Sequence, residues 1–334
     1  MQIDFRIPRE WTSANELVAA QMPAGSNAEP YVFQSIQVAI VEAVYGLSQQ
    51  FSQRKKVFYI KNCDSNFDAA TMVLSKMGYI VTGLDATVLD DPSGFASIIE
   101  RDALLVLYAA DDPILGRRYS VEKLEEALRE KTLAQVRVSH NAHFFAQLKP
   151  ETPRTGVHIY SVKPNAAIAL CGERVRFGVL SANQTKPSTQ LDLGWMKSPL
   201  AEAREKILKF ETAHIADSKP VFASSTSRVY DRAVVSWPDV DGHAVIARLA
   251  QKLNIALSEP GVETRIETTS LSRWGGVRTF DFLKTQNLEA STLRGLVMIS
   301  ADLLDSSLEK ALVETRKELL ADQFAGAIWP TSTV

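Results

Sequence analysis

The chain has 334 residues, of which 46% are hydrophobic and 23% are charged, and its formal net charge is -2. Such a composition is typical of a globular protein with a sizeable core, and the length suggests about two domains. The basic residues are dispersed, with the densest group at Arg54, Lys55 and Lys56, so no nucleic-acid-binding surface is expected.

The sequence carries no signal for a membrane or for export. It contains no run of about 18 apolar residues, and its first residues lack a basic region followed by an apolar core. The two cysteines, Cys63 and Cys171, do not form a CxxC motif, so neither a disulfide framework nor a zinc site is expected. These features predict a cytoplasmic protein.

Short apolar runs alternate with amphipathic segments over the first 180 residues. This alternation predicts an α/β fold with a mostly parallel sheet between helices. The predicted strands are residues 57–60, 79–82, 103–108, 135–138, 157–160 and 175–180. The predicted helices are residues 35–47, residues 67–77 and a third helix that Ser120 would cap.

The pattern changes after a polar stretch at residues 181–193. We therefore predict a large α/β domain over residues 1–195 and a smaller α+β domain over residues 196–334. In the smaller domain, the predicted helices are residues 201–214, residues 241–253 with Asp241 as the cap, and residues 306–320. The predicted strands there are residues 255–258 and 295–300.

The most informative segment is residues 136–182, where three successive predicted strands border polar or charged side chains. These side chains are His140 and His143 after the first strand, Ser161 and Lys163 after the second, and Arg174 and Arg176 beside the third. Ligands of open α/β sheets bind outside the carboxyl ends of the strands. The sequence therefore predicts a ligand site at that edge of the sheet.

The order of Ser-x-Lys after one strand and Gly-x-Arg before the next resembles that of the fold-type-I pyridoxal-phosphate (PLP) aminotransferases and their relatives. The resemblance implies that Lys163 forms the Schiff base with PLP and that Ser161 binds its phosphate. It also implies Arg174 or Arg176 as a phosphate partner. By itself, a lysine after a strand is usually solvent-exposed, and the turn before Arg174 is equally a common surface loop.

Earlier segments extend the resemblance. The segment FQSIQVAIVEAV is similar to the family's helix start at the phosphate, which implies Gln34 and Ser35 as phosphate ligands. Phe67 stands where the family often carries an aromatic ring stacked on the cofactor. Asp112 stands where the family has an asparagine, although Asp111 and Asp112 before a proline are also ordinary turn formers.

Two positions depart from the family's pattern. His140 stands in place of the aspartate that pairs with the pyridine nitrogen, and a neutral imidazole favours the protonated ring less than a carboxylate does. Met298 stands in place of the arginine that binds the substrate carboxylate. Arg294, close by, and Arg273, in the loop SLSRWGG, are candidates for substrate binding.

Other kinds of site are not indicated. His140 and His143 have i,i+3 spacing, yet no HExxH motif or nearby acidic ligand accompanies them, so no metal site is predicted. His143 is a candidate for stacking on the cofactor ring or for a structural hydrogen bond. No GxSxG motif indicates a Ser/His/Asp triad.

Two functions follow as hypotheses. The first is a PLP-dependent enzyme of the aminotransferase type, which acts on an amino acid or another small molecule with an amino group through a Schiff base at Lys163. The resemblance also implies a homodimer. The second is a catalytically decayed protein of the same fold that serves as a binding or assembly subunit, because His140 and Met298 replace functional residues of the family.

Overall fold

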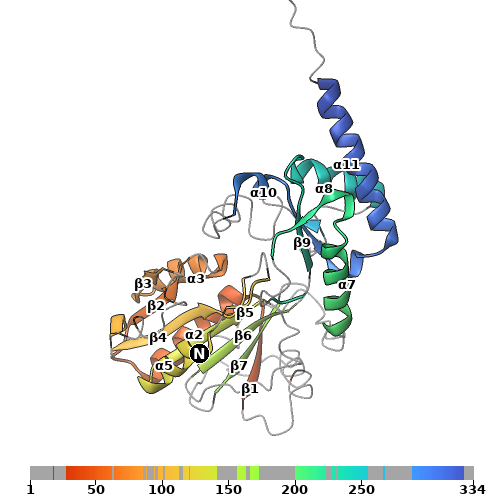
Figure 1. The fold of residues 1–334 in the computed structure, drawn as a ribbon. Helices are drawn as coiled ribbons and strands as arrows, with labels where there is room; N and C mark the ends of the chain where they lie inside the picture. The colour runs from red at the N-terminus through yellow and green to blue at the C-terminus, as the bar shows by residue number, and fades with distance from the viewer. Residues whose placement is uncertain are drawn as a thin grey trace, which may run out of the picture. The chain divides into compact units, whose positions relative to one another are not determined.

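The structure, a computed structural model, describes residues 18, 28–61, 64–85, 88, 94, 97–100, 102–112, 116–119, 121–140, 156–162, 166–172, 200–222, 228–230, 232–254, 266–267 and 288–326. It divides the chain into two compact units, one of residues 1–113 and 117–198 and one of residues 114–116 and 199–334 (Figure 1). Each unit has its own sheet and its own hydrophobic core. The predicted boundary between residues 195 and 196 lies outside the described residues.

The described part of the first unit contains a seven-stranded sheet in the order β1-β7-β6-β5-β4-β2-β3. The strands are β1 (Glu29–Phe33), β2 (Lys56–Ile60), β3 (Ile80–Leu84), β4 (Ala103–Ala109), β5 (Ala134–Ser139), β6 (Gly156–Val162) and β7 (Ala166–Cys171). β2 to β6 pair in parallel, whereas β7 is antiparallel to β6 and to β1. β1 therefore runs in the same direction as β6. All of these strands except β7 end at one edge of the sheet, which we call the carboxyl edge.

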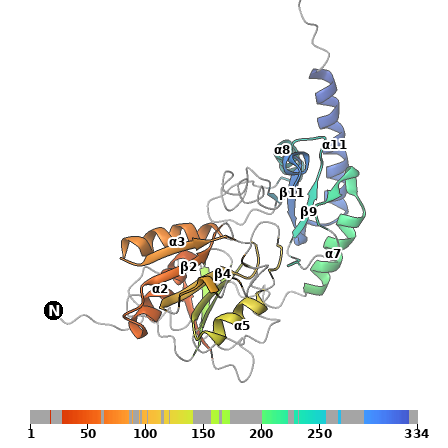
Figure 2. The same cartoon turned by 60° about the vertical axis from the view of Figure 1, so that its left-hand side comes forward.

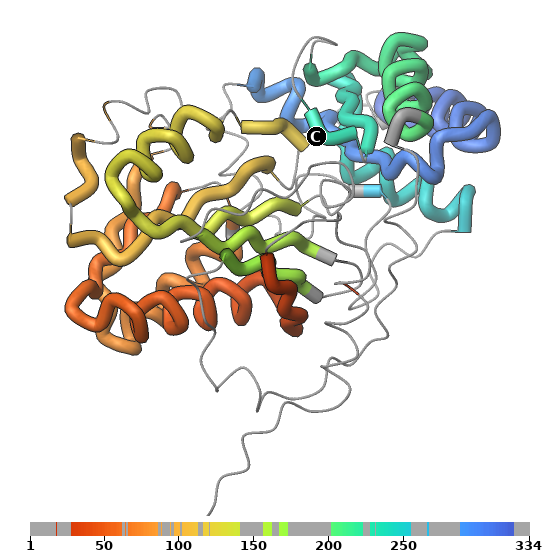
Figure 3. Tube along the Cα trace, turned by 90° about the horizontal axis from the view of Figure 1, so that it is seen from below, coloured from red at the N-terminus to blue at the C-terminus, as the bar shows by residue number. Residues whose placement is uncertain are grey.

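Helices cover both faces of this sheet. α2 (Ile36–Gln50) and α3 (Ser65–Lys76) contact each other, and α2 packs on β5, β6 and β7. α5 (Glu122–Glu130) lies on the opposite face of the sheet, which we call the α5 face (Figure 3). This arrangement confirms the predicted α/β fold with a mostly parallel sheet between helices.

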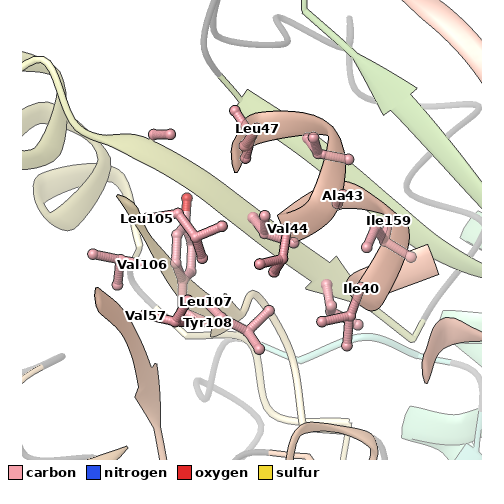
Figure 4. Packing of buried hydrophobic residues seen from close by; sticks show 14 of the residues in the cluster. Ile40, Ala43, Val44, Leu47, Val57, Leu105, Val106, Leu107, Tyr108 and Ile159 are labelled. Atoms are coloured by element: carbon pink, nitrogen blue, oxygen red, sulfur yellow. The ribbon is translucent and has the colours of Figure 1, made fainter. Parts of the chain in front are cut away.

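The position of α2 is fixed by a stripe of fully buried side chains at helical spacing. These side chains are Ile40, Ala43, Val44 and Leu47. Figure 4 shows them packed against Leu105, Leu107 and Ile159 of the sheet. Burying an aliphatic side chain of the size of Ile40, Val44 or Leu47 contributes about 1.5–3 kcal/mol. The stripe therefore holds the first turn of α2 at the carboxyl edge, where β1 ends.

Most predicted elements of the first unit are present. α2 and α3 occupy the predicted helices, and β2 to β6 occupy the first five predicted strands. The sequence patterns do not predict β1 and β7. The predicted strand at residues 175–180 lies outside the described residues, as does Ser120. α5 begins at Glu122 after Val121, without a side-chain cap hydrogen bond.

The second unit contains an antiparallel sheet in the order β10-β11-β9-β8. Its strands are β8 (Lys219–Pro220), β9 (Arg232–Ser236), β10 (Ile266–Glu267) and β11 (Leu296–Ser300), and β9 and β11 lie side by side (Figure 2). The predicted strand at residues 295–300 corresponds to β11, whereas the one at residues 255–258 lies outside the described residues.

The described helices of the second unit are α7 (Leu200–Thr212), η4 (Ile215–Asp217), α8 (Gly242–Leu253), α10 (Ala290–Arg294), η5 (Ala301–Leu303) and α11 (Ser306–Gly326). α7, α8 and α11 bury apolar side chains against one face of β9 and β11, and α10 packs on the other face. Asp241 caps α8 as predicted, accepting from the backbone N–H groups of His243 and Ala244. Of the helices described, none combines the length and the apolar character needed to cross a bilayer.

Candidate functional site

Polar side chains follow the parallel strands at the carboxyl edge. They are Ser35 after β1, Asp64 after β2, Asp111 and Asp112 after β4, His140 after β5, and Ser161 near the end of β6. Phe33 pairs with Ala167, and Ala167 pairs with Ser161, while Tyr160 pairs with Ser139. The register of the strands therefore brings the ends of β1, β6 and β5 level with one another.

Ser35 begins α2 and leaves an anion-binding helix terminus at the carboxyl edge. Its Oγ accepts a hydrogen bond from the N–H of Val38 at 3.2 Å. The amides of Ile36 and Gln37 have no acceptor inside the helix, because the first N–H groups of any α-helix lack one. With the helix dipole, these amides favour a negative group beside Ser35. Gln34, which is half-buried, directly precedes this turn.

His140 is held between two buried aspartates. Its Nε2 lies 2.6 Å from Oδ2 of Asp64, and its backbone N–H donates to both carboxylate oxygens of Asp111, at 3.0 and 3.2 Å. Asp64 is 2% exposed and Asp111 is 1% exposed. Because an ionised carboxylate only accepts, Nε2 carries the hydrogen of the His140–Asp64 pair. A carboxylate at position 140 would face that of Asp64, so histidine suits this position.

Asp64 has a second role as the N-cap of α3. Its Oδ1 accepts from both the backbone N–H and the side-chain Nδ2 of Asn66, at 2.8 Å each. One carboxylate therefore fixes the start of α3 and the ring of His140. The N-cap signature of an aspartate before a helical pattern is the signal by which the sequence could have revealed Asp64.

We expect Asp64→Ala to lower the free energy of unfolding by about 2–4 kcal/mol, because it removes a helix cap and a buried partner of His140. Asp64→Asn retains a cap and is expected to lose about half as much. Urea denaturation measures both values, with Asp241→Ala as a control that removes the cap of α8. Equal losses in Asp64→Ala and Asp241→Ala would contradict the role of Asp64 as the partner of His140.

The other residues of the first unit that were predicted to contact the cofactor lie in a turn, in the core and at the carboxyl edge. Asp112 closes a turn, since its N–H donates to the carbonyl of Arg117 and its Oδ2 accepts from the N–H of Arg117, both at 2.9 Å. Phe67 is 1% exposed and belongs to the core of the first unit. Ser161 is half-buried at the carboxyl edge. The structure thus brings Ser35, His140 and Ser161 to one edge and adds Asp64 and Asp111, to which the sequence assigned no site role.

Five further predicted residues are not tested by the part of the chain that the structure describes. Lys163, His143, Arg174, Arg176 and Arg273 lie outside the described residues. Lys163 is the next residue after Val162, which ends β6, and its role stays a prediction.

Two of the residues considered for substrate binding are described in the second unit. Arg294 ends α10 with its side chain 63% exposed. Met298 is buried in β11 among the side chains that pack on α10. Among the residues that the structure describes, no cluster of three histidine, cysteine or acidic side chains could hold a metal ion.

A second polar group lies on the α5 face of the first sheet. Tyr108, Arg137 and His158 are in register across β4, β5 and β6. Arg137 donates to Glu125 Oε1 at 3.0 Å, lies 2.9 Å from His158 Nδ1, and donates to the Tyr160 hydroxyl at 3.4 Å. We call Tyr108, Glu125, Arg137, His158 and Tyr160 the buried polar network.

Burial sets the protonation states in this network. It raises the pKa of Tyr108 well above its usual value, and the neighbouring Glu125 raises it further. Burial, together with the charge of Arg137, holds the pKa of His158 well below 6.5. His158 is therefore neutral and accepts from Arg137 through Nδ1.

The lowered pKa of His158 predicts a loss of stability in acid. The unfolded histidine gains a proton below about pH 6.5 while the folded one does not, so its contribution is complete above that pH and falls by up to about 1.4 kcal/mol per pH unit below it. His158→Gln keeps an acceptor for Arg137 and should remove this slope. Urea denaturation from pH 7.5 to 5 measures it, with exposed His243→Gln as the control. Parallel wild-type and His158→Gln curves would contradict the prediction.

The comparisons with known proteins concern the whole chain. No protein-family model and no curated protein matches the sequence. A solved NifS-like protein superposes with a TM-score of 0.65 at 13% identity, covering 93% of this chain and 87% of its own. A cysteine desulfurase from Thermococcus onnurineus has a TM-score of 0.60 at 11% identity, with 93% and 84% covered. The chain has the fold of the fold-type-I PLP enzymes.

A third similar structure extends the range of activities found on the PLP-enzyme fold. It is a ureidoglycine-glyoxylate aminotransferase from Bacillus subtilis, with a TM-score of 0.58, 12% identity, and 95% of this chain and 85% of its own covered. At such low identity the likeness establishes the fold alone. The PLP-enzyme fold therefore hosts different reactions, and the chemistry of this chain depends on its own side chains.

Proposed function

We propose that this protein is a PLP-dependent enzyme of the aminotransferase type, acting on a small molecule with an amino group. The observation that carries the proposal is the set of groups at the carboxyl edge. The first turn of α2, Ser161 and the buried His140–Asp64 pair lie at the ends of strands of one sheet, and Lys163 directly follows β6. The fold supports the proposal, because one structural neighbour is an aminotransferase.

The donor set fits the two ends of PLP. The amides of the first turn of α2, with Ser35 and Ser161, would hold the phosphate, because a helix terminus and hydroxyl donors favour a dianion. Arg174 or Arg176 would add a positive charge. His140, oriented by Asp64, would contact the ring end, and Asp112, Gln34, Phe67 and His143 remain proposed neighbours of the cofactor.

A few side chains would carry out the reaction with the cofactor. PLP, when bound, supplies an electron sink for a carbanion at the substrate. Lys163 would hold the cofactor covalently and afterwards carry the proton at its Nζ to and from the substrate carbon. Asp64 would keep the proton on His140 Nε2 and so fix the orientation of the His140 imidazole. Arg294 or Arg273 would bind the substrate's acidic group.

Ser35 provides the sharpest test of the phosphate position. Ser35→Asp keeps a good N-cap but places a negative charge at the start of α2, and two unit charges at 4 Å repel by about 4 kcal/mol at an effective dielectric of 20. We expect Ser35→Asp to weaken PLP binding at least tenfold, as measured by absorbance titration. The neutral cap variant Ser35→Asn should bind within a few-fold of the wild type.

The outcomes of this titration separate the two functions. Saturable binding of one PLP per chain supports the proposed enzymatic function. Equal PLP affinity in the wild type, Ser35→Asp and Ser35→Asn would show that the phosphate does not bind at the start of α2. Absence of saturable binding in the wild type would instead favour a binding or assembly subunit, the alternative that Met298 in β11 supports. We also propose that the protein is a cytoplasmic homodimer. Sedimentation equilibrium, which measures the mass of the assembly, tests the dimer.

A further inference from the structure

A cavity of about 40 Å³ lies between α5 and the sheet of the first unit. Arg118, Glu122, Glu125, Arg137, Ser139 and Tyr160 line it, and all of them belong to the first unit. Its volume accommodates roughly two or three water molecules, or a polar group of three or four atoms. The cavity is therefore too small for PLP but large enough for a carboxylate.

Ser139 presents an unused polar atom to this cavity. The residue ends β5 and is 3% exposed. Its Oγ is fully buried and has no hydrogen-bond partner within the structure described. Buried hydroxyl groups nearly always have a partner, so an unsatisfied one that lines a cavity is free to bond to a molecule in that cavity.

Arg137, whose side chain is 14% exposed, supplies a positive charge in the same cavity lining as Ser139. Its three contacts, with Glu125, His158 and Tyr160, use at most three of the five guanidinium N–H donors. Burial opposes its charge, but Tyr160 and Glu125 raise the pKa of Arg137 above its ordinary value. Arg137 is therefore a charged donor with capacity for a further acceptor.

The charged residues that line the cavity balance, with Arg118 and Arg137 against Glu122 and Glu125, so the placement of its hydrogen-bond donors decides which ion it favours. The carboxylate of Glu125 already accepts from Arg137 and contacts the hydroxyl of Tyr108. The side chain of Arg118 is 38% exposed, whereas that of its ion-pair partner Glu122 is 63% exposed and more strongly screened by water. Donors from Arg137 and Ser139 thus face the interior, and a planar guanidinium matches a planar carboxylate.

We propose that this cavity binds the carboxylate of a small organic acid. Arg137 and Ser139 would hold the two oxygens, and Arg118 would attract the anion from solvent. The site lies on the α5 face, and it does not depend on the proposed reaction at the carboxyl edge.

Titration of the full chain with acetate and formate, at constant ionic strength and followed by NMR chemical shifts, tests this proposal. We expect saturable binding in the millimolar range, since a ligand of roughly three or four atoms binds weakly. The affinity should be the same with and without saturating PLP. Acetamide and guanidinium, which lack the negative charge, should bind at least about tenfold more weakly than acetate.

Variants locate the bound anion. Ser139→Val fills part of the cavity and removes the hydroxyl, so it should weaken acetate binding at least about tenfold, and Ser139→Ala should weaken it about threefold. Arg118→Gln should also weaken it about threefold. Arg129→Gln removes a charge from an exposed position of α5 that does not line the cavity, and it should leave the affinity unchanged.

Each outcome is decisive. Absence of saturable binding, or wild-type affinity in both Ser139 variants, would overturn the proposal. Competition between acetate and PLP would place the anion in the proposed phosphate site at the start of α2 and overturn it as well, while leaving the proposed function intact. Unchanged acetate binding in a protein that does not bind PLP would refute the proposed function and support this site.

Discussion

Replacing Lys163 by alanine is expected to abolish the covalent link between the protein and PLP. An imine requires an uncharged primary amine close to the cofactor, and an alanine side chain offers none. The phosphate contacts proposed at α2 would remain, so Lys163→Ala should still bind PLP without a covalent bond. Borohydride reduction followed by mass spectrometry of the intact chain measures the link, and equilibrium dialysis measures the remaining affinity.

Lys61 provides a matched control. It follows β2 at the carboxyl edge as Lys163 follows β6, and it is exposed. Lys61→Ala should retain the full borohydride-stable adduct. An adduct that persists in Lys163→Ala and disappears in Lys61→Ala would assign the covalent chemistry to the end of β2.

Replacing Arg228 by methionine is expected to cost about 3–5 kcal/mol of unfolding free energy, because it leaves Glu211 as a buried, uncompensated charge. Arg228 donates to both oxygens of Glu211, at 3.0 and 2.9 Å, and the two side chains are 2% and 4% exposed. The Arg228 guanidinium also lies 5.4 Å from the ring centres of Phe222 and Tyr230. Urea denaturation and hydrogen exchange in β9 measure the loss.

A double variant separates charge from packing, and an exposed ion pair provides the control. Glu211 also accepts from the backbone N–H of Val234 at 2.9 Å, so Glu211→Gln removes the charge while keeping that acceptor. The double variant Arg228→Met/Glu211→Gln should recover most of the loss. Lys206→Met, which breaks the exposed pair with Glu202 on the same helix, should cost no more than about 1 kcal/mol. A loss in the double variant equal to that of Arg228→Met would show that packing, not charge, dominates.

The fold was predictable from the sequence where hydrophobic periodicity is strong. β4 is continuously apolar and α2 has a clear helical stripe, so both were found within a few residues. β7 was missed because its sequence, AAIALC, is short and alanine-rich and follows β6 after three residues. Because the preceding strands follow a parallel pattern, the next strand was instead predicted further along the chain, at residues 175–180.

The site was predictable only in part, because sequence patterns locate strand ends but not the partners of side chains. His140 and Ser161 were expected at the carboxyl edge, since each stands at or beside the end of a predicted strand. The contact of His140 with Asp64 joins residues 76 positions apart, and no local pattern encodes it. Arg137 and His158 alternate with apolar residues as solvent-facing positions do, yet the Arg137 side chain is only 14% exposed and His158 only 1% exposed, and the two contact each other.

Mapping the lysine that PLP labels in the wild-type chain tests most directly whether the carboxyl edge is a cofactor site. The protein is loaded with PLP, reduced with borohydride and digested, and the modified peptide is identified by mass spectrometry. We expect one pyridoxyl group per chain, on the peptide that contains Lys163, and its loss when excess inorganic phosphate competes during loading. A label on Lys61, or labels spread over many exposed lysines, would contradict a cofactor bound at the carboxyl edge through Lys163.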